Sequence, residues 1–214
     1  MSQLEVDSVN IRFDDRKILS DIYLKVESGE VTGFLGRNGC GKSTLLKVIF
    51  GSLRGESQSV RLDGKYEQTP FQSTKVKFLP QDGLFPEFLT PAKAISLYQS
   101  DLSRLIQEEE VAGHLNMKFS ELSGGIRKYV ETLILLFSPC KFILLDEPFS
   151  FIAPVLVEKL IPIIREISAT KGVLLTDHQY RSILEVSDKV YLLREQSIYP
   201  VSGEEELKDL GYTN

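Results

Sequence analysis

Residues 36–44 read Gly-Arg-Asn-Gly-Cys-Gly-Lys-Ser-Thr, and this stretch decides the fold that the whole chain is expected to adopt. Every fixed position of the phosphate-loop pattern G-x-x-x-x-G-K-[ST] is filled, by Gly36, Gly41, Lys42 and Ser43. Glycines let the backbone wrap a phosphate and direct successive N–H groups at it. The lysine would reach the β- and γ-phosphates, and the serine hydroxyl would bind Mg²⁺. The pattern therefore predicts a site for a nucleoside triphosphate.

The residues around this phosphate loop support the same interpretation. Residues 30–35 are typical of a buried strand, and residues 44–50 are apolar at helical spacing. A strand, a glycine-rich loop and a helix in that order are the setting of known phosphate loops. The helix N-terminus adds a partial positive charge to the anion site. The alternative, a chance glycine-rich turn between two buried elements, is the weaker interpretation in this context.

Composition and charge are those of an ordinary globular protein. The chain has 214 residues, 42% of them apolar and 26% charged, enough for one large or two small domains. A net charge of −5 argues against a general nucleic-acid binder. No stretch reaches the roughly 18 apolar residues that span a bilayer, and the N-terminus lacks a secretion signal. Two cysteines, Cys40 and Cys140, suit a reducing compartment without disulfides, so a cytosolic protein is expected.

Hydrophobic spacing divides the chain into strand-rich ends around a helical middle. Strands are expected at residues 2–13, 18–26, 30–35, 60–62, 76–79, 141–145, 172–176 and 189–194. Helices are expected at residues 44–50, 92–112, 126–138, 155–168 and 180–186. Pro162 predicts a kink or an early break in its helix. Strands and helices alternate after residue 140, which indicates a mostly parallel α/β sheet.

A second chemical signal lies at residues 142–148, which read Phe-Ile-Leu-Leu-Asp-Glu-Pro. Ligands of open α/β sheets bind at the C-terminal ends of strands, where this apolar run places two acids. Asp146 fits the carboxylate that holds Mg²⁺, and Glu147 fits the group that orients or deprotonates an attacking water. Solvated acids at a strand end are the alternative. That alternative loses weight because a phosphate loop precedes the acids.

These signals, together with two others, appear in the order of a known family. The run consists of the phosphate loop, Gln81, Leu-Ser-Gly-Gly at 122–125, the acidic strand end at 142–147, and His178. In this order the sequence resembles the ATP-binding cassette (ABC) ATPases over essentially its full length. The Leu-Ser-Gly-Gly run is the specific mark, since ordinary P-loop kinases and small GTPases lack it. The region after Asp146 is similar to ATPases of lipopolysaccharide export and branched-chain amino-acid uptake.

The resemblance implies both a fold and a domain organisation. The fold is α/β: a P-loop NTPase core with a mostly parallel sheet, an N-terminal antiparallel β subdomain and a short inserted helical subdomain. Residues 1–214 would form a single ABC ATPase domain. Residues 1–82 and 138–214 would be its catalytic core, and residues 83–137 its helical subdomain.

The resemblance also implies roles for individual residues, with ATP and Mg²⁺ as cofactors. The catalytic residues would be Lys42, Gln81, Glu147 and His178, with His178 contacting the γ-phosphate. The metal ligands would be Ser43, Gln81 and Asp146. The ATP-binding residues would be Phe13, Gly36, Arg37, Asn38, Gly39, Cys40, Gly41, Lys42, Ser43, Thr44, Ser123, Gly124 and Gly125. Phe13 would stack on adenine; its alternative is packing in the core.

The partners follow from the family's arrangement of two cassettes. In the family, each ATP lies between the phosphate loop of one cassette and the Ser-Gly-Gly of the other. Ser123 and the N–H groups of Gly124 and Gly125 begin a helix, which makes a second anion site. The second cassette would be an identical copy or a close paralogue, and a polytopic membrane subunit would complete the transporter. We expect a position on the cytosolic face of the membrane and no nucleic-acid partner.

Two departures from the family pattern leave alternatives open. Ile126 stands where the family usually has Gln, and Ala153 stands where it usually has an Asp that supports contacts across the dimer. Hydrolysis is expected to survive, if slowly, because Lys42, Asp146, Glu147 and His178 are present. The alternatives to a transporter subunit are a soluble ABC ATPase in an assembly role and a nucleotide-binding regulator. A redox role for Cys40 needs a lowered thiol pKa; the alternative is a small residue that fits a tight loop.

Overall fold

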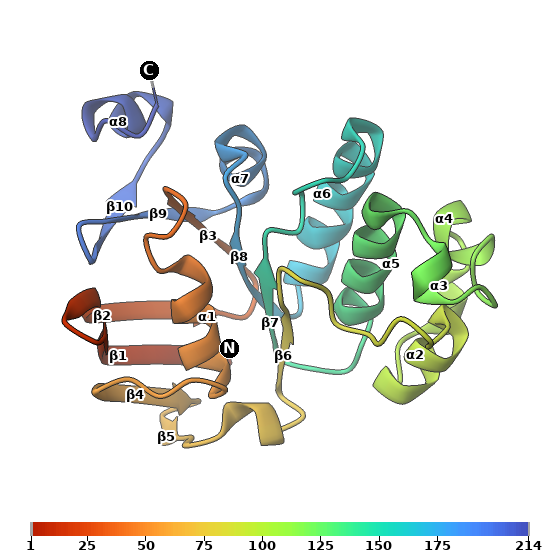
Figure 1. The fold of residues 1–214 in the computed structure, drawn as a ribbon, viewed down its shortest axis with the longest axis horizontal. Helices are drawn as coiled ribbons and strands as arrows, with labels where there is room; N and C mark the ends of the chain where they lie inside the picture. Colours follow the sequence, from red (N-terminus) through yellow and green to blue (C-terminus); the bar gives the residue numbers. More distant parts are fainter. Residues whose placement is uncertain (1, 214) are drawn as a thin grey trace.

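Two β-sheets lie side by side in the computed structural model, which describes residues 2–213 (Figure 1). The smaller sheet has the strand order β2-β1-β4-β5 and is antiparallel throughout. Its strands are β1 (Gln3–Phe13), β2 (Arg16–Glu27), β4 (Ser57–Leu62) and β5 (Lys65–Tyr66). The predicted N-terminal antiparallel subdomain is therefore confirmed.

The larger sheet has the order β10-β9-β3-β8-β7-β6 and carries the strands that end at the phosphate loop and at the paired acids. All neighbouring pairs are parallel except β9 and β10, which form an antiparallel edge. Its strands are β3 (Val31–Gly36), β6 (Val76–Leu79), β7 (Phe142–Asp146), β8 (Gly172–Thr176), β9 (Lys189–Arg194) and β10 (Ser197–Val201). The predicted mostly parallel sheet is confirmed.

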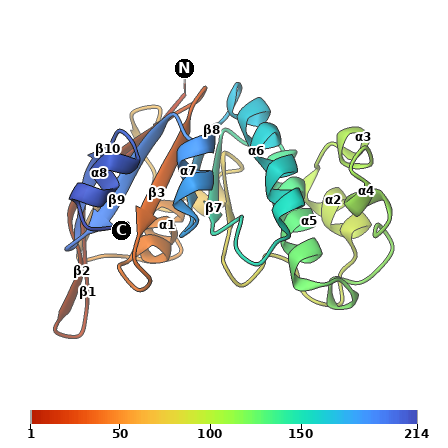
Figure 2. The same ribbon diagram turned by 90° about the horizontal axis from the view of Figure 1, so that it is seen from above.

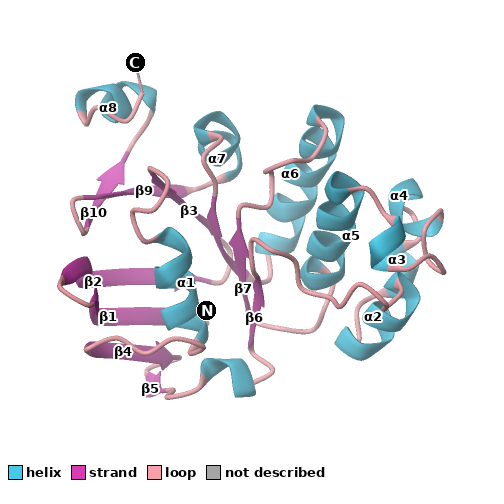
Figure 3. Cartoon of the chain, in the orientation of Figure 1, coloured by secondary structure: helices cyan, strands magenta, loops and turns pink. Residues whose placement is uncertain are grey.

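Helices cover the larger sheet and extend beyond it (Figures 2 and 3). The α-helices are α1 (Lys42–Phe50), α2 (Pro91–Tyr98), α3 (Leu102–Leu105), α4 (Glu109–Ala112), α5 (Gly124–Leu136), α6 (Pro154–Ser168), α7 (Tyr180–Val186) and α8 (Glu204–Asp209). Two 3₁₀ turns are η1 (Pro70–Gln72) and η2 (Phe119–Glu121). The short helices α2, α3 and α4 lie at the end of the molecule away from β1 and β2. No helix within residues 2–213 has the length and apolar character to cross a bilayer.

The larger sheet divides the hydrophobic core in two because successive side chains of a strand point to opposite faces. On β7, Phe142 and Leu144 join the cluster formed with α1 and the smaller sheet. Ile143 and Leu145 join the cluster formed with α5 and α6. Both faces are thus covered, which explains why this strand is apolar at consecutive positions instead of alternating.

The prediction of one helix over residues 92–112 was wrong, because the region contains three short helices. Gln99 adopts a left-handed conformation with φ of 54° and ends α2. Asp101 then accepts hydrogen bonds from the N–H groups of Ser103 and Arg104, which begins α3. Apolar spacing continues across both boundaries, so the periodicity alone did not reveal them.

The predicted early break at Pro162 was also wrong, since α6 continues to Ser168. A proline inside a helix leaves the carbonyl four residues earlier without its N–H donor. Here that residue is Glu158, and both Glu158 and Pro162 lie on the exposed face of the helix. Water can satisfy the free carbonyl there, so the helix continues.

Leu144 offers a direct test of this two-sided core. Its side chain is fully buried, so Leu144→Ala should lower the free energy of unfolding by about 2–5 kcal/mol through lost contacts and a cavity. Leu97→Ala is a matched control, because Leu97 is 69% exposed and should change stability by less than about 0.5 kcal/mol. Urea denaturation measures both. Equal unfolding midpoints for the two variants would contradict the described core.

Candidate functional site

The phosphate loop connects β3 to α1 in a conformation that requires glycine at two positions. Gly41 has φ of 115°, and a Cβ atom there would lie 2.9 Å from the Cγ2 atom of Ile18. At Gly36, a Cβ atom would lie 2.6 Å from the Cys40 sulfur and 2.9 Å from the carbonyl oxygen of Leu193. The glycines of the pattern therefore serve local geometry as well as backbone access to a ligand.

Lys42 is a buried cation held by backbone carbonyls. Its side chain is 5% exposed, and its Nζ atom donates to the carbonyl of Gly36 at 2.8 Å and to that of Arg37 at 3.4 Å. No carboxylate of residues 2–213 forms an ion pair with it. A buried ammonium that only dipoles neutralise attracts an anion strongly.

A cavity of about 490 Å³ opens beside this loop. Its lining combines the phosphate loop with residues from distant parts of the chain, and comprises Phe13, Ile18, Asn38, Gly39, Gly41, Lys42, Ser43, Thr44, Gln81, Glu147, Phe151 and His178. Phe13 is 48% exposed at this cavity, so its ring is not packed in the core. Most residues that the sequence assigned to one site thus share one cavity.

Glu147 lies at the centre of a cluster of polar side chains, with Gln81 and His178, on the wall of this cavity. It is 8% exposed, and its backbone has φ of 52°, a left-handed conformation that few non-glycine residues adopt. Its N–H donates to the carbonyl of Thr176 at 2.9 Å. Its Oε2 atom accepts hydrogen bonds from Gln81 Nε2 at 3.0 Å and Ser150 Oγ at 3.3 Å, and lies 3.8 Å from His178 Nδ1. Gln81 and His178, the other two predicted catalytic side chains at this wall, thus both approach the Glu147 carboxylate.

Asp177, which the sequence analysis missed, organises the loops on either side of this group. It is fully buried, and its Oδ1 atom accepts the N–H groups of His178 at 2.8 Å and Gln179 at 3.0 Å. Its Oδ2 atom accepts the N–H of Phe149 at 2.9 Å. Ser150, also missed, contacts Asp177 and His178 Nδ1 through its hydroxyl. An aspartate directly after a buried strand was the available signal.

Oxygen donors that suit Mg²⁺ are present at this site. The Asp146 carboxylate ends β7, and its Oδ1 atom accepts the hydroxyl of Thr176 at 2.7 Å, which fixes its orientation. Ser43 and Gln81, which each carry an oxygen donor, line the cavity. Among residues 2–213 no three His, Cys, Asp or Glu side chains gather as a metal site. The donor set therefore fits Mg²⁺, which usually binds through one or two protein oxygens together with substrate phosphates.

Seven predicted residues do not line this cavity: Gly36, Arg37, Cys40, Ser123, Gly124, Gly125 and Asp146. Ser123 begins α5, and its hydroxyl accepts the N–H of Ile126 at 3.4 Å. Gly125 packs against the loop after Glu147, where a Cβ atom would lie 2.9 Å from the carbonyl oxygen of Phe151. Gly124 lines a separate cavity of about 270 Å³. Within one chain, the N-terminus of α5 therefore does not line the cavity of Lys42.

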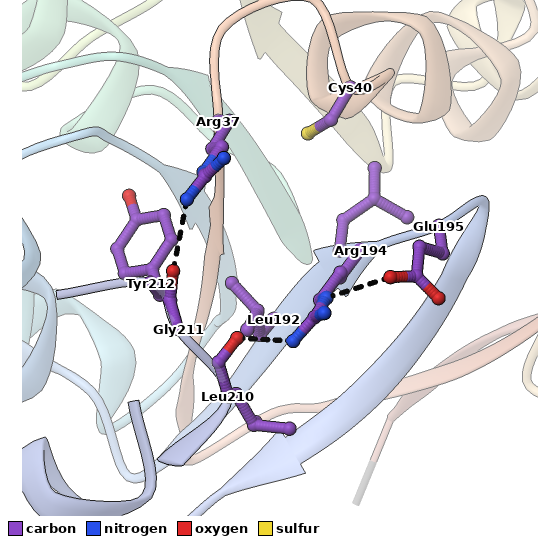
Figure 4. Close-up of a pocket in the computed structure, with 9 residues that line it drawn as sticks. Arg37, Cys40, Leu192, Arg194, Glu195, Leu210, Gly211 and Tyr212 are labelled. Carbon is purple, nitrogen blue, oxygen red and sulfur yellow. Dashed lines mark hydrogen bonds and ion pairs between the residues drawn. The ribbon is translucent and has the colours of Figure 1, made fainter. Parts of the chain in front are cut away.

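Arg37 and Cys40 line a different cavity, beside the C-terminal segment (Figure 4). Arg37 donates to the carbonyl of Gly211 at 3.0 Å, and both residues line a cavity of about 310 Å³ beside the C-terminal segment. Burial raises the pKa of the Cys40 thiol, although Lys42 acts in the opposite direction. A raised pKa disfavours the thiolate, so it removes the basis for a redox sensor here.

Helix α5 fastens the loop that carries Gln81. Lys128 donates to the Gln81 carbonyl at 2.7 Å and to the Pro80 carbonyl at 3.2 Å. Glu131, fully buried, accepts the N–H groups of Leu84 at 3.1 Å and Phe85 at 3.3 Å.

A third residue of α5 completes this clamp. Arg127 donates to the Phe85 carbonyl at 2.7 Å and pairs with Glu131 at 3.1 Å. The position of Gln81, and through it the hydrogen bond to Glu147, therefore depends on α5.

Comparison with known proteins gives consistent results. The sequence model of the ABC transporter family matches residues 19–150. The lipopolysaccharide export ATP-binding protein LptB of Haemophilus influenzae is 31% identical over 90% of this chain and 87% of that protein. LptB of Escherichia coli is 30% identical with the same coverage. A solved ATP-binding subunit of an ABC transporter superposes with a TM-score of 0.84 at 21% identity, covering 98% of this chain and 93% of that one.

Glu131→Leu tests the clamp between α5 and the Gln81 loop. It leaves the N–H groups of Leu84 and Phe85 without their acceptor and removes the carboxylate partner of Arg127, so it should lower the free energy of unfolding by about 3–5 kcal/mol. Glu131→Gln keeps one oxygen acceptor and should cost clearly less. Urea denaturation gives the stabilities, and hydrogen exchange at Leu84 and Phe85 localises the effect. The clamp is refuted if Glu131→Leu leaves both measurements unchanged.

The raised pKa of Cys40 predicts slow alkylation at neutral pH. Only the thiolate reacts, so a raised pKa leaves less of it at pH 7–8 than an ordinary cysteine, whose pKa is about 8.5. The rate of iodoacetamide labelling at Cys40, followed by mass spectrometry, should reach its plateau at a higher pH than that of an ordinary cysteine. A cysteine in an unstructured peptide is the control. If labelling of Cys40 reached its plateau at a lower pH than labelling of the peptide cysteine, a raised pKa for Cys40 would be contradicted.

Proposed function

This chain belongs to the ABC transporter family as an ATP-binding, ATP-hydrolysing subunit, and we propose that it drives transport by pairing with a second cassette around ATP. The observation that carries the proposal is the contact of Gln81, Glu147 and His178 at one wall of the cavity that the phosphate loop forms. Phosphoryl transfer depends on positioning and charge stabilisation, which such a wall supplies.

The phosphates of ATP would replace the backbone carbonyls that now accept from Lys42. The ammonium is already desolvated, so its attraction to a triphosphate is strong at little further cost. The N–H groups of the phosphate loop and the N-terminus of α1 add to the anion site. The exposed ring of Phe13 lines the same cavity and would stack on the adenine base.

Glu147 would orient or deprotonate the attacking water. Glu147 lines the cavity, and the Gln81 amide donates to its carboxylate. His178 would contact the γ-phosphate from the same wall, where its backbone N–H donates to the Asp177 carboxylate. Ser43, Gln81 and Asp146 would hold Mg²⁺, which neutralises charge on the phosphates when it is bound.

A second cassette is proposed because the anion-binding end of α5 lies outside the cavity of its own chain. Ser123, Gly124 and Gly125 become useful to a nucleotide only when another chain presents its phosphate loop to them. We further propose residues 83–137 as the helical subdomain, and residues 1–82 and 138–214 as the catalytic core. The paired cassettes would lie on the cytosolic face of the membrane. A polytopic membrane subunit would receive the movement that their closure produces.

Glu147→Gln tests the catalytic assignment. It removes the carboxylate charge while keeping the shape, so single-turnover ATP hydrolysis should fall by about 10²–10⁴-fold. Binding of Mg-ATP, measured by calorimetry, should remain because the phosphate loop is intact. Glu205→Gln in α8 is the control and should hydrolyse ATP normally. Equal turnover in the wild type and Glu147→Gln would refute Glu-assisted hydrolysis.

Association with a membrane protein distinguishes a transporter subunit from a soluble ABC ATPase. The alternative function is an assembly or regulatory ATPase without a membrane subunit, for which Ile126 and Ala153 are the sequence motive. Affinity capture of the tagged chain from detergent-solubilised membranes, followed by mass spectrometry, should recover a polytopic membrane protein in stoichiometric amount. Recovery of water-soluble proteins alone would favour the alternative.

A further inference from the structure

Residues 203–213 turn back onto the core after β10, and a buried leucine anchors them there. Leu207, on α8, is fully buried in the hydrophobic cluster that α5 and α6 also form. Gly211 then adopts a left-handed conformation with φ of 66°, which ends the helix with a sharp turn. The N–H of Tyr212 donates to the carbonyl of Leu207 at 2.8 Å and closes this turn. The segment therefore has a fixed position on the core.

The first contact of this segment with the ATP site is made through the phosphate loop (Figure 4). The guanidinium of Arg37 donates to the carbonyl of Gly211 at 3.0 Å, and Arg194 on β9 donates to the neighbouring carbonyl of Leu210. The backbone carbonyl of Arg37 accepts from the Nζ atom of Lys42 at 3.4 Å. Arg37 thus contacts the segment through its side chain and the phosphate-binding lysine through its carbonyl.

The second contact is made with the turn that carries His178. The hydroxyl of Tyr180 donates to the Glu204 carboxylate on α8 at 3.1 Å. Arg181 donates to the same hydroxyl oxygen at 3.2 Å, so the hydroxyl hydrogen remains available for Glu204. The N–H of Tyr180 donates to the carbonyl of His178 at 3.0 Å, which makes the two residues part of one short turn. Helix α8 therefore holds this turn through Tyr180.

A groove of about 600 Å³ brings the two contacts together. Its lining combines the phosphate loop, the His178 turn and the segment, and comprises Gly36, Arg37, Asn38, His178, Tyr180, Tyr212 and Thr213. Asn38 and His178 also line the cavity proposed to hold ATP, whereas residues 203–213 do not. Burial raises the pKa of Tyr212, while the backbone N–H of Gly36 acts in the opposite direction. The segment therefore touches two parts of the ATP site from outside the ATP cavity.

We propose that residues 203–213 are a positioning element for ATP hydrolysis, which holds the phosphate loop through Arg37 and the His178 turn through Tyr180. This role rests on the proposed function, because it concerns the same site. Arg37 and Tyr180 are then positioning residues, and neither needs to touch the nucleotide. Positioning matters because a misplacement of about 1 Å in a reacting group can lower a rate roughly 10²-fold.

The two contacts should act on different steps. The phosphate loop supplies the binding of the triphosphate, so a loosened Arg37 contact should weaken affinity for Mg-ATP. His178 is assigned to the γ-phosphate during hydrolysis, so a loosened Tyr180 contact should slow the reaction while affinity is kept. A role in stability alone would not separate affinity from rate in this way.

A double-mutant cycle tests the Tyr180 contact. Tyr180→Phe and Glu204→Ala each remove the hydrogen bond and should each slow single-turnover hydrolysis of Mg-ATP by about threefold to tenfold. The double variant should be no slower than either single variant, since both changes remove the same bond. Affinity for Mg-ATP, measured by calorimetry, should stay within about twofold of the wild type. Glu205→Ala is the matched control: Glu205 is the next residue of α8, is exposed, and should hydrolyse at the wild-type rate.

Calorimetry and hydrogen exchange test the Arg37 contact. Arg37→Ala should weaken Mg-ATP binding by about threefold to tenfold, and Arg37→Lys, which keeps a donor for the Gly211 carbonyl, should bind more tightly than Arg37→Ala. In the nucleotide-free chain, Arg37→Ala should also speed hydrogen exchange at Gly211 and Tyr212. An arginine that acted only on the nucleotide would leave that exchange unchanged. Arg54→Ala, at an exposed arginine beyond the other end of α1, is the control for both measurements.

The outcomes distinguish this role from the proposed function. If the wild type binds and hydrolyses Mg-ATP and the variants at 37, 180 and 204 do the same equally well, residues 203–213 are not a positioning element, although the proposed function stands. If the wild type fails to bind or hydrolyse Mg-ATP, the proposed function is refuted and the positioning role with it.

Two further results would overturn the positioning role. The first is a double variant whose loss of rate is the product of the two single losses, because Tyr180 and Glu204 would then act separately. The second is a lower melting temperature together with rates that fall only in proportion to the unfolded fraction, because the contacts would then serve stability alone.

Discussion

The buried ammonium of Lys42 is the interaction on which the rest of the site depends. A cation that is 5% exposed and neutralised only by the carbonyls of Gly36 and Arg37 is costly to bury. It is retained because the phosphate loop surrounds the place that an anion would take. The glycines at 36 and 41 permit this loop, since side chains there would collide with Cys40 and Ile18. The same few residues thus let the loop pack closely, hold the positive charge and leave the cavity open to a ligand.

Parallel strand order explains how distant segments meet at this loop. The strands β3, β7 and β8 are neighbours in the sheet, so their C-terminal ends lie at one edge. These ends deliver the phosphate loop, the acids Asp146 and Glu147, and the turn that contains His178. Helix α5 then fastens the Gln81 loop to the same group through Lys128 and Glu131. Hydrogen bonds therefore connect α5 to the cavity wall that carries Gln81 and Glu147.

Much of this arrangement could be predicted from the sequence, because the decisive signals are local. The phosphate loop, the apolar strand before Asp146 and the cap at Ser123 each depend on a short run of residues. Contacts across the fold left weaker signals: Asp177 is an ordinary acid in the sequence, and only the structure shows that it joins two loops. The division of residues 92–112 into short helices depended on the left-handed conformation of Gln99, which apolar spacing does not encode.

Calorimetric titration with Mg-ATP tests the central claim most directly, because it gives the affinity for the triphosphate and the Lys42→Ala variant assigns that affinity to the phosphate loop. The wild-type chain should bind Mg-ATP, and Lys42→Ala should lose at least about tenfold in affinity, since a charge-assisted contact to phosphate contributes roughly 1.5–3 kcal/mol. Unfolding curves of both proteins should coincide in shape, which shows that the fold is intact. Absence of binding by the wild type, or equal affinity in Lys42→Ala, would contradict the account.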